Sequence, residues 1–263
     1  MKYFILFFIS LCSMASAQES QPIRDNSFLI EEAFNQEKGV VQHICLLRMN
    51  GSFTPESFSF TQEWPVFSGR HQFSYSLPLV GIESGFTGMY LENIILNYRY
   101  QAVGNEKLFF APRITAILPV HSKGIPTYKS GIEIFLPLSI PLNKFWIMHI
   151  NAGGNFTSEK SEATGLKSEI NTSLSGLSII YMPSNNFNLL SEFLYSVQKI
   201  SQENSSSGTS SLTWNPGFRT VINFKSGLQI VPGLSVPVEI SEGASKAGFI
   251  FYLSFEHPFT KTK

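Results

Sequence analysis

The stretch SGIEIFLPLSI, residues 130–140, decides the fold class because its apolar and polar side chains alternate. The even-numbered positions from 132 to 138 are all Ile or Leu, whereas Glu133 and Ser139 fall on the opposite face of an extended chain. A strand of about 9–11 residues crosses a bilayer when it is tilted. The stretch therefore predicts a membrane-spanning strand with one apolar and one polar face.

The same alternation recurs along the chain, and the connectors between the segments are alternately long and short. Long polar connectors, such as residues 155–166 and 201–210, would be extracellular, and both chain ends would be periplasmic. This pattern predicts an all-β fold, a transmembrane antiparallel up-and-down β-barrel of about 12 strands. The predicted strands are residues 40–49, 57–64, 71–79, 92–101, 108–118, 130–140, 145–153, 167–181, 187–197, 211–224, 228–238 and 247–256.

Composition supports a surface that faces lipid. Charged residues make up 14% of the chain, against about 25% in average soluble domains. There are 19 Lys and Arg residues and 19 Asp and Glu residues, so no basic field exists to attract nucleic acid. Because alternation also occurs in soluble β-sandwiches, that fold remains the alternative.

The N-terminus has the organisation of a secretory signal peptide. Lys2 precedes an apolar run from Tyr3 to Cys12, and Ala15-Ser16-Ala17 fits cleavage before Gln18. Export and a barrel fold together predict the bacterial outer membrane. The expected divisions are a signal peptide at 1–17, an N-terminal periplasmic segment at 18–39, a barrel at 40–256 and a periplasmic tail at 257–263.

The segment before the barrel has the signals of a short helix. Ser27 is a candidate N-cap for a helix from Phe28 to Glu37, with Glu31 and Glu32 in its early turns and Gly39 as its stop. Such a helix would act as a partial plug. The alternative is a loosely held strap without a gating role.

Polar side chains on the inner face of the strands are the candidate site, because the lumen is where a barrel meets water and solute. Mixed charges there can orient a passing solute, or they can form a structural ion-pair network. Both interpretations remain open. The candidate lumen residues are Asn93, Asn97, Arg99, Arg113, Glu133, His149, Asn151, Glu192, Arg219 and Asn223.

Enzyme motifs are not recognisable in the chain. Outer-membrane phospholipases carry a His-x-Ser-Asn-Gly string, and the nearest approach, His149-Ile150-Asn151, lacks the Ser and the following Asn-Gly. The five histidines are scattered without metal-ligand spacing. We therefore expect no catalytic residues, no metal and no cofactor.

Two resemblances add to this reading. Residues 246–253, KAGFIFYL, resemble the terminal signal that the barrel-assembly machinery reads in outer-membrane proteins. The string from Asp25 to Ile44 resembles the bacterial family described by the MetA pathway of phenol degradation, and residues 60–65, 70–75, 96–101 and 111–114 are similar to its other recurrent segments. The family resemblance implies an outer-membrane barrel that transports small, often aromatic compounds.

The predicted function is an outer-membrane channel for the passive passage of small molecules, with aromatic or hydrophobic compounds as the candidate solutes. The alternatives are a lipid-acting hydrolase and a structural or adhesive barrel whose outer loops bind a partner. The expected partners are outer-membrane lipid, the assembly machinery during biogenesis and a small-molecule solute, with no nucleic acid. A monomer is expected.

Overall fold

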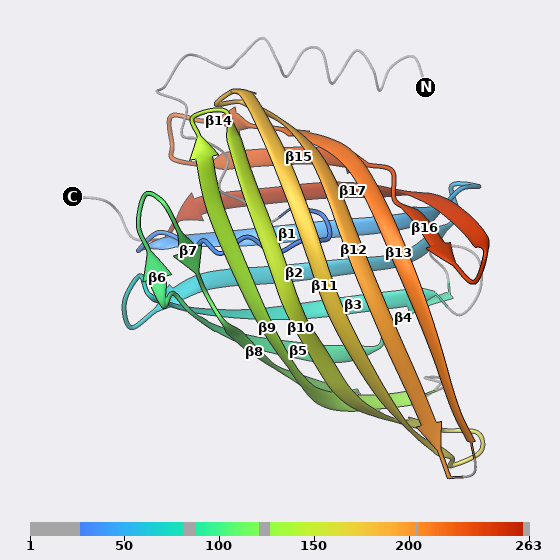
Figure 1. Ribbon diagram of the computed structural model, residues 1–263. Helices are drawn as coiled ribbons and strands as arrows, with labels where there is room; N and C mark the ends of the chain where they lie inside the picture. The colour runs from blue at the N-terminus through green and yellow to red at the C-terminus, as the bar shows by residue number, and fades with distance from the viewer. Residues whose placement is uncertain (1–26, 82–87, 121–126, 204, 260–263) are drawn as a thin grey trace.

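The computed structural model describes residues 27–81, 88–120, 127–203 and 205–259. They form a closed antiparallel β-barrel of twelve transmembrane strands (Figure 1). The predicted fold class is confirmed. The predicted signal peptide, residues 1–17, and residues 18–26 lie outside the described residues.

Several of the transmembrane strands consist of two consecutive pieces. β4 and β5 form one of them, β7 and β8 another, and β15 and β16 a third. The strands are β1 (Val40–Asn50), β2 (Pro55–Val66), β3 (His71–Gly81), β4 (Met89–Leu91), β5 (Asn93–Tyr100), β6 (Val103–Gly104), β7 (Phe109–Phe110), β8 (Arg113–Pro119), β9 (Thr127–Asn143), β10 (Trp146–Ser161), β11 (Lys167–Ser184), β12 (Phe187–Gln202), β13 (Ser205–Thr220), β14 (Ile222–Asn223), β15 (Gln229–Ser235), β16 (Val238–Ser241) and β17 (Ala244–Pro258).

The barrel closes where β1 meets β17. These strands pair over their whole common length, from Val40 opposite Pro258 to Asn50 opposite Gly248. On its other side β1 pairs with β2, so the first strand has a hydrogen-bonded neighbour on both edges. Closure removes the open sheet edges that would otherwise leave backbone groups unpaired in lipid.

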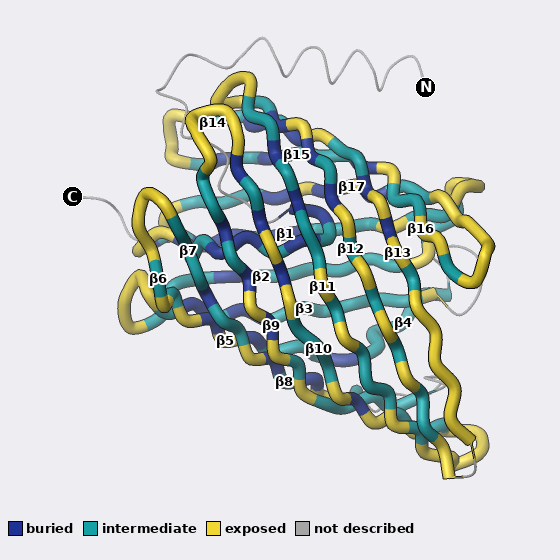
Figure 2. The backbone as a smooth tube through the Cα atoms, in the orientation of Figure 1, coloured by how far each residue is buried: buried dark blue, intermediate teal, exposed yellow. Residues whose placement is uncertain are grey.

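The apolar face of the strands points outward. Ile132, Ile134 and Leu136 are 50%, 47% and 41% exposed, whereas Phe135 is 6% exposed and Ser139 is fully buried. Figure 2 shows the same alternation of exposed and buried residues along β9 to β13. An exposed apolar band around a closed barrel is the surface that hydrocarbon covers.

Two predicted boundaries need correction. The predicted loops 155–166 and 201–210 are largely strand, because β10 continues to Ser161, β12 continues to Gln202 and β13 begins at Ser205. Cross-strand pairing from Val197 opposite Ser210 to Gln202 opposite Ser205 orders a polar sequence that resembled a loop. As a result β9 to β13 project beyond the neighbouring strands (Figure 1).

Pro232 and Pro237 lie in the segment predicted as the strand 228–238, and proline lacks the N–H that a ladder needs. The strand is interrupted after Ser235, and it resumes at Val238, just after Pro237. The barrel extends to Pro258, two residues beyond the predicted end. No helix in the described part of the chain is long and apolar enough to cross a membrane.

Candidate functional site: the lumen and the strap inside it

Residues 27–37, called the strap from here on, run in an extended form inside the barrel. The predicted helix from Phe28 to Glu37 is wrong, because these residues form only bends and extended chain. Their backbone N–H groups donate to barrel side chains instead of to carbonyls of the strap. The pairs are Leu29 and Ile30 with Glu192, Glu31 with Asn151, Ala33 with Ser139, Asn35 with Gln101 and Gln36 with Gln72. The barrel wall therefore supplies the partners that a helix would have supplied internally.

Two adjacent acidic residues of the strap reach different walls. Glu31 forms ion pairs of 3.0 Å with Arg99 and with Arg113, on β5 and β8. Glu32 pairs with Arg219 on β13, with Nη2 and Oε1 2.7 Å apart. Successive side chains of an extended chain point in opposite directions, so one dipeptide bridges the lumen.

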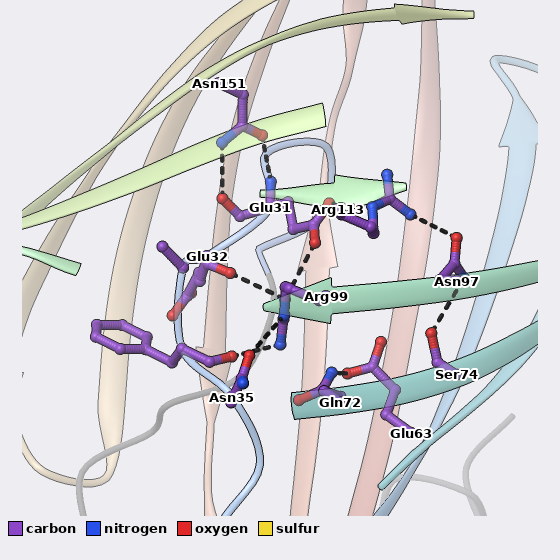
Figure 3. A network of polar contacts seen from close by, with 12 residues as sticks. Glu31, Glu32, Asn35, Glu63, Gln72, Ser74, Asn97, Arg99, Arg113 and Asn151 are labelled. Atoms are coloured by element: carbon purple, nitrogen blue, oxygen red, sulfur yellow. Dashed lines mark hydrogen bonds and ion pairs between the residues drawn. The ribbon is translucent and has the colours of Figure 1, made fainter. Parts of the chain in front are cut away.

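Arg99 contacts several residues of the strap. Its guanidinium also donates to the carbonyls of Glu32 and Phe34 and to the side-chain oxygen of Asn35. Figure 3 shows Arg99 inside the turn that the strap makes, with Asn151 holding the backbone of Glu31 from the other side. These contacts fix the strap along its backbone as well as through its charges.

A row of buried polar residues crosses five strands at one level. Ser139, His149, Ser178, Glu192 and Asn215 are register neighbours from β9 to β13, and all are fully buried. Ser139 Oγ lies 2.7 Å from His149 Nδ1, and Asn215 donates to the Glu192 carboxylate at 2.6 Å. The row forms the polar wall against which residues 29–33 of the strap lie.

The remaining candidate residues lie around this centre. Arg113 forms an ion pair of 2.7 Å with Glu133 and donates a hydrogen bond of 2.9 Å to the side-chain oxygen of Asn97. The Asn93 side chain donates to its chain neighbour Glu92, and the Asn223 side chain accepts from Gln229. Among the described residues, neither side chain forms a hydrogen bond with the strap. The candidates that the strap brings together by direct hydrogen bonds or ion pairs are Arg99, Arg113, Asn151, Glu192 and Arg219.

Five residues of this site were not predicted as lumen residues from the sequence. Glu31 and Glu32 belong to the strap and were assigned to a helix, and the wall residues are Gln72, Gln101 and Ser139. Gln101 Nε2 donates to the carbonyls of Ala33 and Val103, and its oxygen accepts from Asn35. Ser139 was recognisable as a polar position in the 130–140 alternation. The acidic pair had no such signal, because its partners lie far along the chain.

Glycines in the wall leave room for the apolar side chains of the strap. A Cβ on Gly176 would lie 2.2 Å from Cδ1 of Ile30, and one on Gly217 would lie 2.7 Å from Cε2 of Phe28. Phe28 also packs edge-on against Tyr252, with ring centroids 5.7 Å apart. The inner surface of the barrel is therefore shaped to the strap.

Burial and charge act against each other at Glu32. Desolvation raises the pKa of the Glu32 carboxyl above its ordinary value, and the Arg219 guanidinium opposes that rise. A buried carboxylate without that partner would be far more costly. The ion pair is therefore a condition for placing an acidic strap in this lumen.

Two cavities border the strap. One of about 210 Å³ lies between residues 27–31 and the wall formed by β1, β2, β3, β5 and β8. The other, of about 570 Å³, has Leu29 of the strap in its lining and extends to the β1–β2 hairpin. Within the described ranges, no group of three or more His, Cys, Asp or Glu residues is arranged to hold a metal ion.

A solved structure of another protein has the same fold. The COG4313 outer membrane channel from Pseudomonas putida F1 superposes with a TM-score of 0.64 at 10% identity, covering 89% of this chain and 99% of that one. A NanC porin gives a TM-score of 0.48 at 9% identity, covering 82% of this chain and 98% of the porin. This protein is an outer-membrane β-barrel.

Sequence comparison adds no family. No family model matches the chain, and no curated protein matches it. The similarity to the MetA-pathway family therefore remains a resemblance of short segments.

Proposed function

We propose that the protein is an outer-membrane channel for small molecules in which the strap narrows the lumen at mid-height. The observation that carries this proposal is that the polar lumen is occupied by a chain segment that hydrogen bonds and ion pairs join to the wall, with Phe28 and Ile30 packed against it. A twelve-strand barrel is wider than the eight-strand kind that wall side chains can fill. The strap supplies the missing interior, and cavities lie beside it.

The similarity in fold to an outer membrane channel supports the same class of function. Passage requires a path past Ile30 and Ala33, which are buried by the wall. A shift of the strap toward the periplasm would open such a path. A single chain closes the barrel through β1 and β17, so a monomer is sufficient for this function.

One observation favours the alternative of a hydrolase: the Ser139 hydroxyl lies within hydrogen-bond distance of His149. Both side chains are fully buried, and the Ser139 hydroxyl also accepts the backbone N–H of Ala33. A nucleophile has to reach its substrate. This pair instead holds the strap, so the channel has better support.

Conductance in planar bilayers tests the proposal. We expect the wild-type protein to give small conductance steps, and a variant whose residues 28–36 are replaced by an equally long Gly-Ser sequence to give steps at least threefold larger. A matched control replaces residues 201–207, at the tip of the β12–β13 hairpin, in the same way and should conduct like the wild type. A folded strap variant that conducts no better than the wild type would overturn the proposal.

A further inference from the structure

The larger cavity carries charges of both signs. At one end of the barrel, the backbone N–H of Phe259 donates to the carbonyl of Gly39. The cavity lies at the opposite end. Four charged side chains line it, and they come from β1, β2, β16 and β17. They are Arg48, Glu56, Glu239 and Lys246.

Glu56 and Glu239 act electrostatically on Arg48, but the structure describes no close ion pair among the four charged side chains. Within the described part of the chain, none of them takes part in a hydrogen bond, and no ion pair within 4.0 Å joins any of them to another residue. The charges beside the strap behave differently, because Arg99, Arg113 and Arg219 are each ion-paired. Unpaired charges around a cavity are available to a solute.

Backbone features set the positions of these side chains. The β1–β2 register changes between Arg48, opposite Ser57, and Met49, opposite Pro55, so Glu56 is an extra residue. A bulge of this kind turns a side chain toward a site that regular pairing would not reach. Glu239 and Lys246 are directly opposite each other on β16 and β17. Each pair of strands thus presents one acidic and one basic group.

Another part of the cavity lining is apolar and hydroxylic. Leu29 of the strap, Leu174 on β11 and Leu194 on β12 line it, together with Ser196, Ser211 and Thr213. A solute with only charged groups would leave the three leucines facing water. A solute with an apolar body would bury part of this surface.

We propose that the cavity binds a small zwitterion with an apolar body, such as an apolar amino acid or dipeptide. A singly charged solute is attracted by two of the four groups and repelled by the other two, so its gain is small. A zwitterion can place its carboxylate near Arg48 or Lys246 and its ammonium near Glu56 or Glu239. The inference deepens the proposed channel function by naming the class of solute.

Calorimetric titration of the purified protein in detergent with leucyl-leucine is the first test. We expect leucyl-leucine to bind at least tenfold more tightly than N-acetyl-leucyl-leucine, which is only anionic, or leucyl-leucine amide, which is only cationic. Equal affinity for the three ligands, or no measurable binding of leucyl-leucine, would overturn the inference.

Two variants locate the site. Arg48→Gln and the double change Glu56→Gln with Glu239→Gln should each weaken leucyl-leucine binding at least fivefold. Lys144→Gln and Glu106→Gln, at exposed turns of the opposite end, are the matched controls and should bind like the wild type. Variants that migrate as folded barrels in unheated gels yet keep wild-type affinity would refute the assignment.

Uptake of leucyl-leucine into liposomes separates this inference from the channel proposal. Binding without uptake would support the cavity as a zwitterion site and contradict a channel for that solute. Uptake without saturable binding would support the channel and overturn the site.

Discussion

Two residues of the strap, Glu31 and Glu32, form ion pairs with arginines of the barrel wall. Glu32 is almost fully buried and pairs with Arg219, whereas Glu31 is partly exposed and shared between Arg99 and Arg113. Removal of one partner from a buried ion pair leaves an uncompensated charge. The two acidic neighbours should therefore differ in the effect of their loss.

Glu32→Gln should lower the free energy of unfolding by about 3–5 kcal/mol, because the buried Arg219 guanidinium would lose the carboxylate that lies 2.7 Å from it. Urea unfolding in detergent micelles measures this change. Glu31→Gln should lower the free energy of unfolding by less, since solvent reaches the ion pairs of Glu31 with Arg99 and Arg113.

The double variant Glu32→Gln with Arg219→Gln is the control for this cycle. It should be more stable than Glu32→Gln alone, because neither member of the ion pair is then left buried and charged after loss of the other. Equal destabilisation by the single and the double variant would contradict the role given to this ion pair.

Gly176→Leu should displace the strap, because the new side chain would occupy the place of Ile30. The readout is a cysteine at position 33, in a background with Cys45→Ser. Ala33 is fully buried, so Ala33→Cys should resist a polar maleimide and become reactive when Gly176→Leu is added. Gly69→Leu is the control, since a Cβ there meets nothing within 4 Å; reactivity unchanged by Gly176→Leu would contradict the fit.

At the scale of elements, the strap and the projecting hairpins differ in what holds them. The strap depends on side chains from at least seven strands, β3, β5, β8, β9, β10, β12 and β13, together with Gln101 just beyond β5. The outer part of β13, residues 205–210, pairs only with β12, because β16 pairs with β13 from Ser211 onward. Its removal should therefore leave the barrel wall intact.

Replacement of residues 198–209 by Asn-Gly should leave folding and conductance unchanged. Val197 and Ser210 are opposite each other, and Asn-Gly is a favoured two-residue hairpin turn. Heat-modifiable gel mobility reports the folded barrel, and bilayer recordings report conductance. Failure of the shortened chain to fold would show that the projection guides barrel assembly.

The whole molecule is organised by an apolar exterior and a polar interior. Leu136 lies near the middle of the exposed band, whereas Ile240 lies on β16 near the outer end of the barrel. Lipid makes the cost of a charge depend on depth.

Leu136→Arg should therefore lower the free energy of unfolding in phospholipid vesicles by about 2–4 kcal/mol, and Ile240→Arg by about 0–1 kcal/mol. Urea titration with tryptophan fluorescence measures both. Similar costs at the two positions would argue that this surface does not cross the bilayer as described.

The sequence by itself determined the class of fold and the two faces of the strands. The period-two pattern at 130–140 is local, and each residue of it predicts its own face without knowledge of the neighbouring strands. The same is true of the interruption near Pro237, since proline lacks the N–H that a ladder needs. Lumen residues such as Arg99 and Glu192 were identified for the same reason.

Only the tertiary structure decided what those residues contact. Capping signals favoured a helix at 28–37, but wall side chains such as Glu192, Asn151 and Ser139 compete for the same backbone N–H groups. These partners are separated from the strap by more than 100 residues in the chain. No local pattern encodes such a contact, because it exists only after the barrel has closed.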